Sequence, residues 1–145
     1  MEDVVIRRLK KEDADEIGRI DAVITKRPLE DDFRKMVAEL AKSSGNMSYI
    51  AEYKGKVVGY MITYLLSGGF GMDKSAWIAT LGVEPKLMGQ GIGKTLAKKI
   101  FDYYTEKGIQ NIYTSVRWDS TDLLSFFKTL GFDRSVFINL RKDIK

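Results

Sequence analysis

Apolar residues recur along the chain at two different spacings, which separate predicted helices from predicted strands. A spacing of three to four residues, typical of a helix with one buried face, marks four segments: 13–24, 28–40, 91–107 and 121–130. Alternating or continuous apolar runs of strand length mark the others: 4–9, 47–53, 57–65, 75–83, 111–118 and 135–142. Pro28 is expected to begin the second helix, and Gly131 to end the last one.

The order of these segments predicts a mixed α/β (α+β) fold. Taken in turn they give β-α-α-β-β-β-α-β-α-β, with a hairpin around Gly55 and one crossover helix between the strands near residues 80 and 115. The sheet is therefore expected to be mostly antiparallel. The chain of 145 residues shows no repeat, low-complexity segment or linker, so residues 1–145 are expected to form a single domain.

Two stretches of the sequence bear on the cellular location of the protein. The N-terminal sequence MEDVVIRRLKKEDADE becomes charged almost at once, unlike a signal peptide. The longest apolar run, Val57–Leu66, is too short to cross a bilayer and contains a glycine and two tyrosines. A cytoplasmic protein without membrane contact is the expectation.

The composition excludes several kinds of chemistry. The chain has no cysteine, and therefore no disulfide, thiol nucleophile or thiolate metal site. It has no histidine, which excludes a Ser-His-Asp triad, an imidazole base and a histidine-based zinc site. Acid–base chemistry must use carboxylates, tyrosines, lysines or water, and no metal is expected. The net charge of +4 favours an anionic ligand, and its spread along the chain argues against nucleic acid as partner.

The stretch GQGIGKT, Gly89–Thr95, stands where a predicted strand meets a predicted helix. It is not a P-loop, because Met88 occupies the position of the first glycine, and it lacks the Gly-x-Gly-x-x-Gly spacing of dinucleotide sites. These counts argue against a nucleotide-phosphate enzyme built on its GKT residues. Glycines here leave backbone N–H groups free to bind a phosphate, which the helix dipole also favours. Alternatively, they only permit close packing of the helix on the strand.

Two separate motifs resemble the GNAT acyltransferase superfamily. Residues 81–96, LGVEPKLMGQGIGKTL, are similar to its acyl-CoA-binding core, in which a strand ending in valine is followed by x-Pro, a turn, Gln/Arg-x-x-Gly-x-Gly/Ala and a helix. Residues 123–132, LLSFFKTLGF, are similar to the family's closing helix and its Leu-Gly-Phe exit. Met88 departs from the pattern, which usually has Gln or Arg there. Four residues agree with the family pattern: Val83, Pro85, Gly91 and Gly93.

The resemblance implies a GNAT-like fold, with a mixed, mostly antiparallel sheet of six to seven strands flanked by four helices. It also implies acetyl-CoA as co-substrate and direct transfer of the acetyl group to a primary amine. The acceptor would be a small molecule or a peptide, and the protein a monomer or a homodimer. The residues expected to contact the CoA are Leu81, Gly82, Val83, Met88, Gly89, Gln90, Gly91, Ile92, Gly93, Lys94, Thr95, Ser120 and Phe127.

The implied reaction needs a base more than an acid. Deprotonating a lysine-like amine costs roughly 4.6 kcal/mol at pH 7, whereas releasing the CoA thiolate costs about 2 kcal/mol. Many relatives have a tyrosine acid where this chain has Phe127, and a glutamate on the strand that here reads WIATLGV. The nearest carboxylate, Asp119, is the candidate catalytic base, acting through water. Alternatively, Asp119 is only the N-cap of the following helix, with Asp122 at its third position.

Other acidic residues, and the groups that are missing, leave further alternatives. Asp21 and residues 30–32 would suit a cationic acceptor, but we interpret them as acids that offset the dipole in the first turns of helices. The absence of the tyrosine and of the strand glutamate keeps a second function open. The chain could be a catalytically weak or inactive acyl-CoA-binding module.

Overall fold

The computed structural model describes residues 3–28, 30–68, 71 and 73–145. In this part of the chain, five strands form one sheet in the order β1-β2-β3-β4-β5. Their bounds are β1 Val4–Arg8, β2 Tyr49–Tyr53, β3 Lys56–Leu66, β4 Ser75–Val83 and β5 Ile112–Thr114. The first three pairings are antiparallel and the β4–β5 pairing is parallel. The predicted mixed sheet, its hairpin and its single crossover are therefore confirmed.

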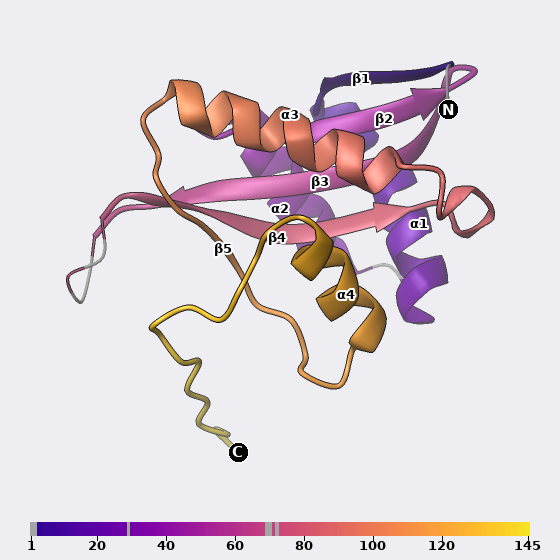
Figure 1. Ribbon diagram of the computed structural model, residues 1–145. Coiled ribbons are helices and arrows are strands. Elements are labelled where there is room, and N and C mark those ends of the chain that lie inside the picture. Colours follow the sequence, from indigo (N-terminus) through magenta and orange to yellow (C-terminus); the bar gives the residue numbers. More distant parts are fainter. Residues whose placement is uncertain (1–2, 29, 69–70, 72) are drawn as a thin grey trace.

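Helices cover both faces of the sheet (Figure 1). The four α-helices are α1 Ala14–Thr25, α2 Asp31–Lys42, α3 Ile92–Glu106 and α4 Thr121–Thr129, and the 3₁₀ turns are η1 Lys11–Asp13 and η2 Pro85–Leu87. Helices α1 and α2 pack on one face, and α3 crosses β2, β3 and β4 on the other, with α4 beside it. No helix among the described residues is both long enough and apolar enough to span a bilayer.

The core lies in two layers because neighbouring residues of a strand point to opposite faces of the sheet. Tyr60 and Ile62 of β3 join the layer beneath α1 and α2, whereas Met61 between them joins the layer beneath α3. All three side chains are completely buried. The helices contribute their apolar stripes to these layers, which explains the helical periodicity of the sequence.

The predicted number of strands is wrong: the described residues form five, not six to seven. The strand expected at 135–142 is not formed, and the one expected at 111–118 is reduced to β5. Alternating side chains of the C-terminal segment lie in solvent, with Val136 94% and Ile138 82% exposed. An alternating pattern gives a segment the potential to be a strand, but a strand also needs a partner edge with which to pair.

The start of the second helix also differs from the prediction. Helix α2 begins at Asp31, with Glu30 as its N-cap, and not at Pro28. Leu29, which we expected in its first turn, lies outside the described residues. The remaining helices agree with prediction to within a residue or two at each end.

Candidate functional site

Strand β4 pairs with β5 only as far as a bulge in β4. The parallel pairing joins only Ala76–Ile78 to Ile112–Thr114. On the other side of β4, Ile62 of β3 faces Thr80 while Thr63 faces Ile78, so Ala79 is an extra residue without a partner. Beyond the bulge, β4 keeps its pairing with β3, but among the described residues no strand pairs with its other edge. Residues 79–83 of β4 therefore have an open edge.

The open edge of β4 leads through η2 into a glycine turn at the N-terminus of α3 (Figure 1). Gly89 and Gly91 have φ angles of +82° and +84°, in the left-handed region where glycine is least strained. Gly91 is the N-cap of α3 and provides no side-chain cap. The first backbone bond of the helix, from the Thr95 N–H to the Gly91 carbonyl, is 3.0 Å long. The N–H groups of residues 92–94 therefore have no acceptor within the helix.

Space and charge at this turn suit an anion. A Cβ atom built on Gly89 or Gly91 would meet nothing within 4 Å, so the region above the turn is open. The helix dipole adds partial positive charge at the same end. Backbone N–H groups at an open helix N-terminus form a general binding site for phosphate.

The structure brings most of the predicted CoA-contacting residues together along this path. Leu81, Gly82 and Val83 lie on the open part of β4, and residues 88–95 form the turn and the first residues of α3. The Thr95 hydroxyl donates to the Gly91 carbonyl at 2.8 Å and so stabilises the turn itself. Gly93 has a packing role, since a Cβ atom there would lie 3.1 Å from the ring of Phe126.

Phe127 lies in α4, which packs beside α3, and Ser120 directly precedes this helix. Phe127 is only 5% exposed, and its ring packs against Phe132 at a centroid distance of 5.0 Å. Its side chain is thus part of the core, and its contact with CoA stays a prediction. Ser120 is the N-cap residue of α4 but makes no side-chain cap bond.

Asp119 is not the helix cap that we considered, because the cap position belongs to Ser120. The exposed Asp119 carboxylate instead accepts two hydrogen bonds from the Arg117 guanidinium, at 3.0 and 2.9 Å. These bonds lower the pKa of Asp119 below its ordinary value. A lowered pKa makes the carboxylate a weaker base, although a catalytic role for Asp119 stays a prediction.

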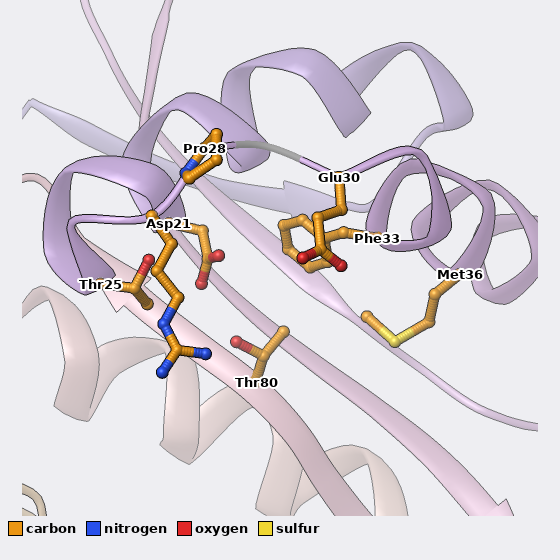
Figure 2. Close-up of a pocket in the computed structure, with 8 residues that line it drawn as sticks. Asp21, Thr25, Pro28, Glu30, Phe33, Met36 and Thr80 are labelled. Carbon is orange, nitrogen blue, oxygen red and sulfur yellow. The ribbon is translucent and has the colours of Figure 1, made fainter.

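A second site lies on the α1/α2 face of the sheet, where the sequence analysis considered Asp21 and residues 30–32 for a cationic acceptor but favoured a role in offsetting the helix dipole. Figure 2 shows side chains from α1, from the N-terminal part of α2 and from β4 around one hollow. The cavity has a volume of about 310 Å³. Its lining residues are Asp21, Thr25, Arg27, Pro28, Glu30, Phe33, Met36 and Thr80. Thr80 is also the residue next to the β4 bulge, so the cavity adjoins the open edge.

Asp21 is the half-buried carboxylate of this cavity. It lies in the second half of α1, so our interpretation of it as a first-turn acid is wrong, although Asp31 and Asp32 do occupy the first turn of α2. The Tyr60 hydroxyl donates to Asp21 Oδ1 at 3.4 Å. Burial raises the pKa of Asp21 above its ordinary value, and the Tyr60 hydrogen bond opposes that rise. No sequence motif marks this pair, because α1 and β3 meet only in the folded chain.

A sequence profile of the acetyltransferase (GNAT) family matches residues 14–132. The chain therefore belongs to the acetyltransferase (GNAT) family. The matched region runs from the start of α1 to just beyond α4, and so includes both the glycine turn and the Asp21 cavity.

Two acetyltransferases are among the proteins whose sequences are similar to this chain. The mycothiol acetyltransferase of Amycolatopsis mediterranei is 29% identical over 89 residues, which cover 59% of this chain and 30% of that protein. The N-alpha-acetyltransferase RimI of Mycobacterium tuberculosis is 33% identical over 57 residues, which cover 39% of this chain and 34% of that protein. The chain spans about a third of the length of these curated relatives.

Solved structures share the fold over nearly their whole length. An aminoglycoside acetyltransferase, meta-AAC0020 from an uncultured soil metagenomic sample, has a TM-score of 0.81 at 20% identity, with 99% of this chain and 98% of that chain covered. AAC(6')-Iy in complex with a CoA-containing bisubstrate analog has a TM-score of 0.79 at 18% identity, with 97% and 99% covered. Likeness at these identities establishes the GNAT fold.

Proposed function

We propose that this protein binds acetyl-CoA and transfers its acetyl group directly to a primary amine. The observation that carries the proposal is the open edge of β4 at residues 79–83, which leads into the glycine turn and the N-terminus of α3. A ligand that fits both features has amide groups along an extended arm and a pyrophosphate at the end of that arm. Coenzyme A has this arrangement.

The two ends of the ligand would be bound by different physical means. The pantetheine amides would pair with backbone groups of Leu81–Val83, as an added strand pairs with a sheet edge. The pyrophosphate would accept hydrogen bonds from the N–H groups at the start of α3. This orientation directs the thioester toward the bulge at Ala79, beside Thr80 and the cavity on the α1/α2 face.

In the proposed reaction, the neutral amine attacks the thioester carbonyl carbon and forms the new C–N bond. The C–S bond then breaks, and the electron pair leaves with the CoA sulfur. The attack leaves the nitrogen positively charged, and it passes one proton to this thiolate. The thiolate then departs as the free thiol. The ammonium form must lose one proton before the attack, and this proton passes to the solvent through a base.

A second function has a specific observation in its favour. The described strand β4 contains no acidic residue, and the buried side chain of Phe127 has no hydroxyl group that could donate a proton. A chain without these groups could bind acyl-CoA and turn it over slowly or not at all. The proposed acceptor is a small-molecule or peptide amine, in keeping with relatives named for mycothiol and aminoglycosides.

Isothermal calorimetry with acetyl-CoA tests the binding site. Gly91→Glu puts a carboxylate where the pyrophosphate should lie and should weaken binding by roughly 100-fold or more, the scale of lost charge-assisted hydrogen bonds. Gly108→Glu is the matched control, because Gly108 also has a positive φ, +78°, and open space around it, but lies past the other end of α3. Equal affinities for the two folded variants would contradict the placement.

Release of free thiol from acetyl-CoA in the presence of an amine panel separates the enzyme from the binding module. The transferase proposal requires thiol release that depends on the amine and an acetylated product detected by mass spectrometry. Tight acetyl-CoA binding without any acetylated product across the panel would favour the binding module.

A further inference from the structure

Asp21 is unusual among the half-buried acids of this protein, because no Arg or Lys among the described residues lies within ion-pair distance of it. Glu52 and Glu84, by contrast, are paired with arginines at 2.7 and 3.1 Å. The partner that Asp21 does have is the neutral Tyr60 hydroxyl, at 3.4 Å. Removing a carboxylate from water is costly unless a positive charge compensates it. A cation bound in the cavity that Asp21 lines would therefore be stabilised by this carboxylate.

The other lining residues define what kind of cation fits. Phe33 and Met36 of α2 provide an apolar wall, and in Figure 2 their side chains lie across the hollow from Thr25 and Asp21. The remaining charged residues of the lining, Arg27 and Glu30, are exposed, and their charges are opposite. A ligand with an ammonium group at Asp21 and an apolar stem against α2 matches this distribution, and a volume of about 310 Å³ suits a molecule of amino-acid size.

The cavity also lies where an acceptor must be. Thr80 lines the cavity and belongs to the open part of β4, one residue from the bulge toward which the thioester is directed. An amine at Asp21 would thus approach the thioester from the α1/α2 face, while CoA occupies the edge between β4 and β5. The two substrates would meet at the strand without competing for space.

We propose that this cavity binds the acceptor as a primary ammonium on an apolar stem, and that Asp21 holds the ammonium and takes up its proton. This inference rests on the proposed function. The ammonium N–H bond breaks, the proton goes to the Asp21 carboxylate, and the nitrogen keeps the electron pair with which it attacks the thioester. Asp21 later releases the proton to solvent. Tyr60 of β3 is the positioning residue, since its hydroxyl donates a hydrogen bond to the Asp21 carboxylate.

The groups that face Asp21 make this proton transfer dependent on pH. They are Tyr60 from β3, Arg27 and Glu30 from the segment between α1 and α2, and the uncharged Thr80, Phe33 and Met36 from β4 and α2. Burial and the nearby Asp21 charge raise the pKa of Tyr60, so its hydroxyl stays protonated at neutral pH. Activity should fall as acid protonates Asp21, at a pH above the ordinary aspartate pKa because burial raises it.

A matched pair of probes tests the inference: 2-phenylethylamine as acceptor, and 2-phenylethanol as its uncharged analogue. In Asp21→Asn, kcat/KM for the amine at pH 7 should fall by roughly 10²–10⁴, the usual contribution of a general base. The loss should shrink at higher pH, where more of the amine is already neutral. The inhibition constant of 2-phenylethanol and the affinity for acetyl-CoA should stay within about twofold of wild type, because neither depends on the charge. Asp15→Asn is the matched control, because Asp15 is an exposed acid of the same helix, and it should keep the wild-type kcat/KM. Asp119→Asn tests the other candidate base in parallel.

Three results would overturn the inference. The first is an Asp21→Asn enzyme with wild-type kcat/KM, and the second is a loss in Asp119→Asn instead. The third is a wild-type protein that binds acetyl-CoA but neither binds nor acetylates 2-phenylethylamine. Failure of the proposed function is distinguishable, since it appears as absent acetyl-CoA binding. In that case, direct calorimetric binding of 2-phenylethylamine to wild type and Asp21→Asn still decides whether the cavity binds an ammonium.

Discussion

Replacing Gly82 by alanine puts a methyl group where the ring of Tyr60 now lies. The two residues are directly opposite in the β3–β4 ladder. A Cβ atom built on Gly82 would lie 2.6 Å from the Tyr60 hydroxyl oxygen and 2.7 Å from Cζ. Both distances are below 3.0 Å, which Cβ atoms essentially never show, so the ring or the strand must move. The contact with Asp21, already 3.4 Å long, would be lost with it.

The expected cost follows from how little room Tyr60 has. Its side chain is completely buried, so the ring cannot turn into solvent and must displace core neighbours. Overpacking of this kind lowers the free energy of unfolding by about 1–3 kcal/mol. For a chain of this size, each kcal/mol lowers Tm by roughly 2–4 °C. Because Asp21 loses its positioning residue, acetylation of 2-phenylethylamine should also fall.

Urea unfolding followed by circular dichroism measures the loss of stability. Gly93→Ala is the comparison, because its Cβ atom would lie 3.1 Å from the half-buried ring of Phe126, which can move aside. Alanine within a helix also gains up to about 1 kcal/mol over glycine, so Gly93→Ala should be nearly neutral. A Gly82→Ala and Tyr60→Leu double-mutant cycle should show a favourable coupling of roughly 1 kcal/mol or more. An unchanged urea midpoint for Gly82→Ala, or the absence of coupling, would refute the reasoning.

Two further predictions concern buried polar contacts. Tyr104→Phe should lower the free energy of unfolding by about 1–3 kcal/mol in urea titrations, because it removes the partner of the buried Met47 N–H, 3.0 Å away, and of Thr63. Wild-type stability would contradict it. Burial raises the pKa of Asp13, but hydrogen bonds from Arg7 and a backbone N–H outweigh this and leave the pKa below its ordinary value. The ion pair should therefore stabilise the fold above about pH 4, the unfolded aspartate pKa, and this stability should disappear as pH falls through the lower folded pKa. Asp13→Asn should be about 1–3 kcal/mol less stable at pH 7, the scale of lost hydrogen bonds to a charged group, because Arg7 keeps its ion pair with Glu52. Urea titrations should show that difference shrink toward pH 3. A difference independent of pH would mean that the charge contributes nothing.

The sequence by itself determined the features that depend on local geometry. The spacing of apolar residues identified α3 and α4 almost to the residue, because a helix repeats its buried face every three to four positions. The hairpin around Gly55 and the turn at Gly89–Gly91 were also predictable, since positive φ angles strongly favour glycine. The acyl-CoA motif was recognisable because strand, turn and helix are consecutive in the chain.

The tertiary structure alone decided features that join distant segments. The bulge at Ala79 depends on the register between β3 and β4, and nothing within β4 itself encodes it. Asp119 is not the helix cap considered from the sequence, because its carboxylate binds the guanidinium of Arg117, two residues away, and not the N-terminus of α4. The Asp21 cavity needs α1, β3 and β4 to meet, and the segment 135–142 needs a partner edge that no periodicity can provide. Local patterns specify the conformations that a segment can adopt, whereas burial, register and charge pairing arise only when the folded chain brings distant residues into contact.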